Sequence, residues 1–283
     1  MIDTHAAFAA LLPWLPPGSG VPALAGLNAA IAASARPPHT DAGASIHFVA
    51  TAAAMSAADY ETRILRTGAV PTRPGHPHDA FNALCWIAFP EFKRACNALH
   101  AAQLAPGAAA PGAGRGPVRD ALTLLDESGV LVLCGDQALA GLLAARRWRE
   151  LFCARRADVA RALRFFVCGH ALYEKLLAPY PGITGRALIV AAPAAVFEQE
   201  PAAQLRFADA AAARALRKGI AAAQVPPLPL AGIPDWDPGN GAPAFYDNAA
   251  VFRPPQASTA SGSAATSAQS ACAPAPVSSS GEP

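Results

Sequence analysis

The sequence predicts a single α+β domain, and three observations support this fold class. The chain has 283 residues, enough for a self-standing hydrophobic core. Strand-like and helix-like runs follow one another in a mixed order, without a visible internal repeat. The clearest local pattern, at 120–134, is typical of a β-hairpin. An α/β sheet with an antiparallel hairpin edge is the alternative.

The domain is expected to occupy residues 44–254. Before it, residues 1–43 combine an Ala-rich helix with Pro breaks and predict a peripheral N-terminal segment. After it, residues 255–283 are rich in Ser, Ala, Pro, Thr and Gln and have almost no large apolar side chain. Such a composition predicts a disordered tail.

The first half of the domain is expected to contain a short strand, two helices and the hairpin. The strand covers 46–50, and the first helix covers 79–88. Pro90 and Glu91 start the second helix, which extends to about residue 103, because Pro and an acid are favoured in a first turn. Within 120–134, ALTLL and VLVLC flank a turn of Asp126 to Gly129, which makes Asp126 a turn former.

The second half is expected to alternate helices with strands and to end in an ordered arm. Helices are predicted over 136–163, 169–177 and 201–223, and strands over 164–168 and 186–191. Residues 225–254 are too rich in Pro and Gly for regular structure. Their aromatic side chains would be costly to leave in water, so we expect this Pro-rich arm to pack on the domain: Trp236, Phe245, Tyr246 and Phe252.

Composition favours a cytoplasmic protein and no membrane span. The chain is 53% hydrophobic, but Ala inflates this value and no apolar run approaches the roughly 20 residues that a spanning helix needs. The N-terminus lacks the basic region of a secretory signal. The six cysteines form no CxxC pair, which indicates reduced thiols rather than a disulfide framework or zinc ribbon.

Net charge is only +2, but one region is distinctly basic. Seven arginines lie between residues 146 and 164, against Glu150 and Asp158. A solvated helix face is the simpler interpretation of this charge. A surface that contacts phosphate or nucleic acid is the alternative, because guanidinium groups match phosphate oxygens.

Several segments in order resemble a bacterial family known as domain of unknown function 3025. They cover about residues 44–254: YETRI at 60–64, GAVPTR at 68–73, HDAFNALCWIAFPEFK at 78–93, RDALTLLDESG at 119–129, GHALYEKL at 169–176, LPLAGIPDW at 228–236 and FYDNAAVFRP at 245–254. The resemblance implies no activity, cofactor or catalytic residue. The chemistry below therefore rests on residue types and spacing.

The densest polar stretch lies between residues 71 and 103. His78 and Asn82 share one face of the first helix, and a second polar stripe on the next helix could face them: Lys93, Asn97 and His100. One interpretation is structural, with Asp79 as a helix cap and His78 and Asn82 bonded to loop backbone. The other is a functional site in which Arg73 holds an anion.

His170 and Glu174 form a second candidate at a predicted strand-to-helix junction. They are four residues apart on one helix face, and a helix N-terminus would keep the His170 imidazole neutral. Asp120 is a third candidate, because an acid beside an apolar run needs Arg119, Arg73 or a metal as its partner. For His170, an equal alternative to a functional role is that its side chain is simply buried and hydrogen-bonded.

Other catalytic classes are disfavoured. There is no GxSxG, GxGxxG or GxxxxGK[ST] pattern. Cys168 ends an FFVC run that reads as a buried strand, so a reactive thiolate is not expected there.

Two functions remain in competition. The first is a hydrolase that acts on a phosphate- or carboxylate-bearing substrate, with a divalent metal as an optional cofactor. The second is a non-catalytic binding protein whose polar cluster is structural and whose Arg-rich helix contacts an anionic partner. The hydrolase would use the following residues: His78, Asp79, His170 and Glu174 for catalysis, Arg73, Asn82 and His100 for substrate binding, and His78, Asp120 and His170 for the metal.

Overall fold

The computed structural model describes residues 5–16, 20–52, 55–104 and 116–254. The predicted disordered tail lies outside the described residues. The helices are α1 Leu24–Ala32, α2 Ala57–Thr67, α3 Pro77–Ala88, α4 Pro90–Leu104, α5 Pro117–Ser128, α6 Gln137–Ala144, α7 Arg156–Ala162, α8 His170–Lys175, α9 Ala194–Phe197 and α10 Pro201–Arg217. A π-helical turn spans Glu150–Ala154, and 3-10 turns lie at Ala6–Phe8, Leu12–Trp14, Ala222–Gln224, Leu230–Gly232 and Pro243–Asp247.

The strands form two sheets. The larger sheet has the order β4-β3-β5-β6, in which β3 is parallel to β5 and the outer pairs are antiparallel. The smaller sheet is a parallel pair, β1 and β2. The α+β class is therefore confirmed. The strands are β1 His47–Ala50, β2 Ala69–Thr72, β3 Gly129–Cys134, β4 Leu163–Val167, β5 Thr184–Ala191 and β6 Pro227–Pro229.

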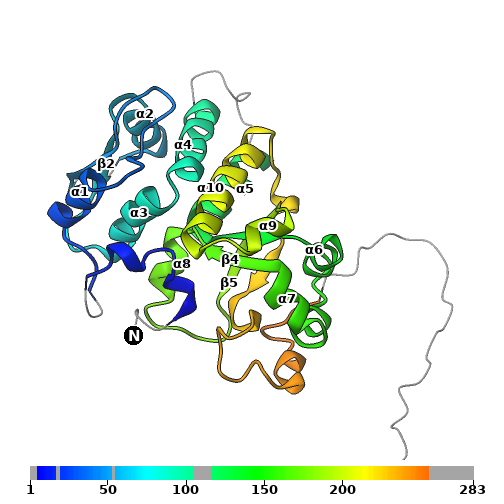
Figure 1. The fold of residues 1–283 in the computed structure, drawn as a ribbon. Coiled ribbons are helices and arrows are strands. Elements are labelled where there is room, and N and C mark those ends of the chain that lie inside the picture. Colours follow the sequence, from blue (N-terminus) through cyan, green and yellow to red (C-terminus); the bar gives the residue numbers. More distant parts are fainter. Residues whose placement is uncertain (1–4, 17–19, 53–54, 105–115, 255–283) are drawn as a thin grey trace, which may run out of the picture.

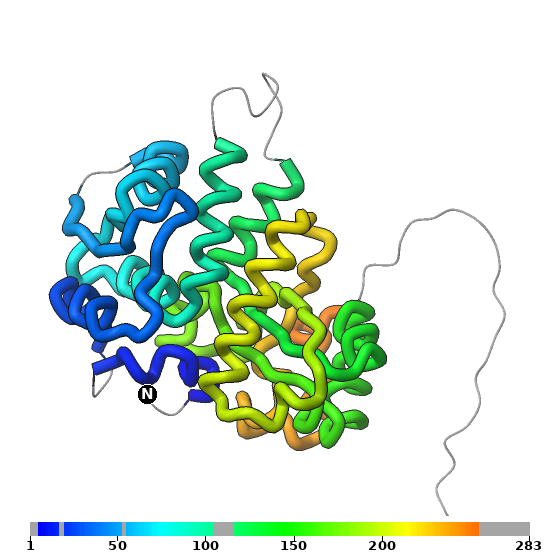
Figure 2. The backbone as a smooth tube through the Cα atoms, turned by 45° about the horizontal axis from the view of Figure 1, so that its top comes forward, coloured from blue at the N-terminus to red at the C-terminus, as the bar shows by residue number. Residues whose placement is uncertain are grey.

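Helix α4 lies at the centre of the molecule. It packs against α2 on the side of the small sheet and against α5 and α10 on the side of the large sheet (Figure 1). Figure 2 shows α4, α5 and α10 side by side from a second direction. Every residue of β3 is buried, as expected for a strand covered on both faces.

A buried carboxylate fixes the start of α4. Asp209 of α10 accepts hydrogen bonds from the amides of Glu91 (3.2 Å) and Phe92 (2.8 Å). These amides have no partner within their own helix, so the contact caps α4 from another part of the chain. Burial raises the pKa of Asp209 to about 6, although the two amides and Arg36 favour its charged form.

The predicted hairpin at 120–134 is wrong. Residues 117–128 form α5, and only the second run forms a strand, which pairs with β4 rather than with its own neighbour. Asp126 is consequently a helical residue and not a turn former. The helical signals were present: Pro117 at the first position, Asp120 in the first turn, and buried Ala121, Leu122 and Leu125 at helical spacing.

Other differences concern breaks and additional elements. The single helix predicted over 136–163 is three pieces, since the backbone of Arg146 is left-handed (φ 54°) just after α6. Helix α2 and strand β2 were not predicted, although Ser56 caps α2 and Gly68 ends it at φ 69°. The predicted peripheral segment buries Phe8, Leu11 and Leu27 in the common core.

The Pro-rich arm is ordered, as predicted. Tyr246 and Phe252 are buried, and the Tyr246 hydroxyl lies 3.1 Å from the carbonyl oxygen of Gly232. Trp148 donates from Nε1 to the carbonyl of Arg253 at 3.2 Å, which ties the end of the arm to the domain. No helix in the described part of the chain is both long and apolar enough to cross a membrane.

Two glycines let α8 approach the end of α5. A Cβ added to Gly169 would overlap the backbone of Gly129 and would lie 2.5 Å from the amide nitrogen of Ser128. The backbone of Gly169 is ordinary (φ −77°, ψ 118°), so the requirement is for space alone. This close approach brings His170, the first residue of α8, beside the last turn of α5.

We expect Gly169→Ala to lower the free energy of unfolding by about 1–3 kcal/mol, because the new methyl group must push two backbones apart. Urea denaturation measures the change. The control is Gly141→Ala in α6, where an added Cβ meets nothing within 4 Å. That variant should be more stable than wild type by about 0.5–1 kcal/mol, since Ala favours a helix over Gly. Equal stability of the two variants would contradict the steric account.

Candidate functional site

The site is organised around a buried ion pair between Lys93 of α4 and Asp126 of α5. The Lys93 ammonium contacts Asp126 Oδ1, and the two side chains are only 5% and 19% exposed. Burial alone would raise the pKa of Asp126 and lower that of Lys93. Their mutual attraction outweighs this effect, so the pKa of Asp126 lies well below its usual value and that of Lys93 lies above. Both groups are therefore charged at neutral pH.

A first polar chain leads from Asp126 through two histidines. Asp126 Oδ2 lies 3.7 Å from His170 Nδ1, and His170 Nε2 lies 3.1 Å from His78 Nε2. His78 Nδ1 is 3.0 Å from Glu174 Oε2. The chain thus joins α5, α8 and α3 and brings together three residues that were predicted to be catalytic.

The protons of this chain can be placed in two ways. Burial lowers the pKa of His170 to about 4, so its ring is neutral at neutral pH. A neutral His170 that turns Nδ1–H toward Asp126 accepts at Nε2 from His78. His78 then also donates from Nδ1 to Glu174 and is an imidazolium. Because 3.7 Å is too long for a hydrogen bond between His170 Nδ1 and Asp126, the other tautomer satisfies the same distances: His170 donates from Nε2, and His78 is neutral with its proton on Nδ1.

A second polar chain leads from the ion pair to a phenol. Lys93 Nζ donates to Asn82 Oδ1 at 2.8 Å, and Asn82 Nδ2 donates to the Tyr60 oxygen at 2.9 Å. Burial raises the pKa of Tyr60, so the phenol keeps its proton. Among the described residues, the Tyr60 hydroxyl has no acceptor for that proton. It can therefore donate to a ligand.

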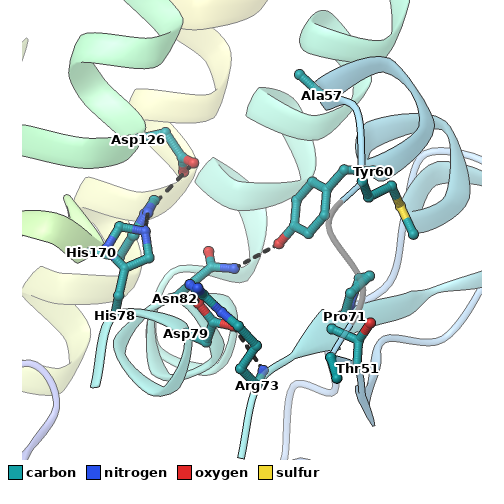
Figure 3. Close-up of a pocket in the computed structure, with 12 residues that line it drawn as sticks. Thr51, Ala57, Tyr60, Pro71, Arg73, His78, Asp79, Asn82, Asp126 and His170 are labelled. Atoms are coloured by element: carbon teal, nitrogen blue, oxygen red, sulfur yellow. Dashed lines mark hydrogen bonds and ion pairs between the residues drawn. The ribbon is translucent and has the colours of Figure 1, made fainter. Parts of the chain in front are cut away.

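Both chains lead into one pocket of about 480 Å³, which His78, His170, Asn82 and Tyr60 line and Glu174 does not. Figure 3 shows His78 and His170 on one side, Tyr60 on the other and Asn82 between them. The wall also includes residues of the small sheet and of the loop before α2, such as Thr51, Met55 and Pro71. The pocket thus lies between the α2 and small-sheet region and helices α3, α5 and α8.

Arg73 and Asp79 form an ion pair at this pocket. Asp79 accepts from the Arg73 backbone amide (2.8 Å), from Nε (2.9 Å) and from Nη2 (2.7 Å). Burial acts to raise the pKa of Asp79, but the hydrogen bonds from Arg73 lower it below its usual value. The Arg73 side chain is 50% exposed, and its Nη1 is bonded to no described residue. Asp79 therefore orients Arg73.

The remaining predicted residues lie elsewhere. Asp120 is in the first turn of α5, six positions before Asp126, and does not line the pocket. His100 is buried in α4, also away from the pocket lining, and burial lowers its pKa. Within the described ranges there is no group of three or more His, Cys, Asp or Glu side chains that could hold a metal ion. The predicted set of His78, Asp120 and His170 is not assembled.

The two imidazoles nevertheless resemble part of a metal site. Their Nε2 atoms lie 3.1 Å apart, and each Nδ1 faces a carboxylate, as the second nitrogen of a metal-bound histidine commonly does. A divalent ion at this position would take two protein ligands and complete its shell with water or substrate. A metal at this position stays a prediction.

Sequence reasoning missed Tyr60 and the role of Asp126. Tyr60 lies on α2, whose capping serine and terminal glycine were readable in the sequence. Asp126 was assigned to a turn, whereas helical spacing from Leu122 and Leu125 would have placed it beside the buried face.

The Arg-rich region is largely neutralised within the molecule. Six of its seven arginines have carboxylate or carbonyl partners: Arg147 with Glu150, Arg149 with Asp247, Arg155 and Arg161 with Asp158, Arg156 with Asp235, and Arg164 with the carbonyl oxygens of Ala160 and Leu163. Among the described residues, Arg146 has no such partner. Few charges of this region are left for an extended anionic partner.

Comparison with known protein families gave a match. The family model described as "Protein of unknown function (DUF3025)" matches residues 46–256. No curated protein and no solved structure matched the chain.

We expect Lys93→Met to destabilise the protein by about 3–5 kcal/mol, because Asp126 would be left buried without its cation. Chemical denaturation at neutral pH measures this loss. Arg149→Gln is the matched control, since its ion pair with Asp247 is about 60% exposed on both sides. It should cost less than about 1 kcal/mol. Similar losses for the two variants would show that the Lys93 pair is not a central element.

His170 should make stability fall in acid. The unfolded chain protonates this histidine near its ordinary pKa of 6.5, whereas the folded protein does so only near 4. Between these values the unfolded state binds more protons, so lowering the pH across this window lowers the free energy of unfolding, by on the order of 2–3 kcal/mol.

Denaturation curves measured between pH 4 and 7 for wild type and His170→Gln test this expectation. The wild type should lose more stability than the variant as the pH falls. The exposed His47→Gln variant controls for the loss of any histidine and should follow the wild type. Parallel curves for wild type and His170→Gln would show that His170 is not buried in its neutral form.

Proposed function

The chain belongs to the DUF3025 family of proteins of unknown function, and we propose that it is a hydrolase acting on a small carboxylate- or phosphate-bearing substrate. The observation that supports this proposal is that two polar chains start at the ion pair of Asp126 and lead into the same pocket. One ends at His78, which holds a proton, and the other ends at Tyr60, which holds a free O–H donor. A purely structural cluster does not require both His78 and the Tyr60 hydroxyl to face a pocket.

The two ends have complementary chemical roles. Tyr60 donates to the carbonyl or phosphoryl oxygen that gains negative charge when water attacks, and Lys93 polarises this donor through Asn82. His78 donates its proton to the departing oxygen as a general acid. Arg73, held by Asp79, contacts the anionic group of the substrate through its free Nη1.

Glu174 completes the proton balance. Its side chain is 42% exposed beside His78, and its carboxylate takes a proton from the attacking water. After the reaction Glu174 carries that proton and His78 is neutral. Transfer from Glu174 Oε2 to His78 Nδ1 across 3.0 Å restores the starting state. His170 and Asp126 keep the second nitrogen of His78 in a fixed hydrogen bond throughout.

Water is the attacking group in this proposal, because the cysteines near the site are unsuited to attack. Burial raises the pKa of Cys85 and Cys168 well above the usual value, which keeps both thiols protonated. No serine lies among the residues that line the pocket. The proposed reaction therefore forms no covalent intermediate on Cys85 or Cys168.

We expect His78→Asn to lower the hydrolysis rate at least about 100-fold, the usual scale of a lost general acid. Tyr60→Phe should lower it about 10–1,000-fold through loss of one donor to the developing oxyanion. Rates are measured on nitrophenyl acetate, nitrophenyl succinate and nitrophenyl phosphate, with and without a chelator, to identify the substrate class and any need for a metal.

Two exposed residues provide matched controls. His47→Asn and Tyr180→Phe make the same chemical changes away from the pocket and should leave the rate unchanged. Melting temperatures should agree within a few degrees for His78→Asn and wild type, since His78 is about one-third exposed. Failure of the wild type to hydrolyse any of the three substrates above the buffer rate, or full activity in His78→Asn, would favour the non-catalytic binding protein.

A further inference from the structure

A second cavity, of about 690 Å³, lies at the edge of the large sheet beneath the end of the Pro-rich arm. It shares no lining residue with the pocket of His78 and Tyr60. Its wall contains three arginines, Arg146, Arg186 and Arg253, and no aspartate or glutamate. We propose that this cavity binds a phosphate-bearing small molecule through these three guanidinium groups.

Strand geometry explains why Arg186 faces the cavity. Arg186 and Thr184 are two residues apart on β5, so they project from the same face of the sheet. The facing residues on β6 are Pro227 and Pro229, which contribute no charge. The opposite face of β5 carries Gly185 and Ala187, which are buried in the core.

The other two arginines come from segments whose backbones are tied in place. Arg146 follows α6 in a left-handed conformation, and its amide donates to the carbonyl of Leu143 at 3.0 Å. Arg253 is fixed through its carbonyl, which accepts from Trp148 Nε1 at 3.2 Å. Three separate segments thus present positive charge to one cavity.

Within the described part of the chain, the arginines of this cavity have no acidic partners. Among the described residues, no salt bridge involves Arg146, Arg186 or Arg253, although the neighbouring Arg147 and Arg149 are both paired. Three like charges around one hollow repel one another unless an anion joins them. Arg forks match phosphate oxygens.

The size of the cavity argues for more than a free ion. Small-molecule sites usually occupy about 300–1,000 Å³, so 690 Å³ accommodates a phosphate group together with an organic body. The apolar wall of Val251 and the prolines would contact that body. Orthophosphate, pyrophosphate and a phosphomonoester are three candidate ligands that share this phosphate chemistry.

The test is thermal stability and calorimetric titration of the full chain with orthophosphate, pyrophosphate and glycerol phosphate, at constant ionic strength. A bound anion should raise Tm increasingly with its concentration, whereas sodium chloride should not. Arg186→Gln and Arg146→Gln should each weaken binding of the tightest anion about 10-fold or more, because each removes a charge-assisted contact. Tighter binding of glycerol phosphate than of orthophosphate would identify an organic phosphate as the ligand.

Arg149→Gln is the control, since it removes the same charge from a paired arginine nearby and should leave affinity unchanged. Without ligand, Arg186→Gln should be at least as stable as wild type, because a repulsive charge is removed. The proposal is overturned if no phosphate raises Tm beyond chloride, if citrate binds as tightly as the phosphates, or if Arg149→Gln weakens binding equally. It is independent of the hydrolase proposal, because neither set of variants touches the other cavity.

Discussion

The ion pair of Lys93 and Asp126 is the interaction on which the site depends. Two buried charges are favourable only together, so each fixes the position of the other and of its helix. Asp126 also faces His170, and Lys93 also binds Asn82. Both polar chains would lose their common anchor without the pair. The stability of the α4–α5 contact and the chemistry of the pocket therefore share one cause.

The surrounding fold serves this pair through contacts between distant segments. Asp209 of α10 accepts from the amides of Glu91 and Phe92, the two residues directly before Lys93. It therefore fixes the position of the turn that carries the lysine. The close approach of Gly169 to Gly129 places His170 beside α5. Neither contact involves the pocket itself. The precision of the site is thus supplied by the core, as expected for groups that must be held in fixed geometry.

Local patterns predicted much of the fold but only part of the site. The α+β class, helices α3 and α4 and the ordered arm follow from helix-start signals and from apolar side chains that must be buried. The run before Asp126 was ambiguous, because a short apolar segment fits a strand and a helix alike. The site also joins residues 33 and 96 positions apart, Lys93 with Asp126 and His78 with Glu174. Spacing along one helix cannot reveal such pairs.

The two cavities differ in how their charges are balanced. In the first, Lys93 has Asp126 and Arg73 has Asp79 as a carboxylate partner, and His78 lies beside Glu174. A balanced network can move a proton between neighbouring groups without creating a net charge in the interior. In the second, the cations of Arg146, Arg186 and Arg253 lack such partners among the described residues. That arrangement reaches neutrality only when an anion arrives, so it favours binding over proton transfer.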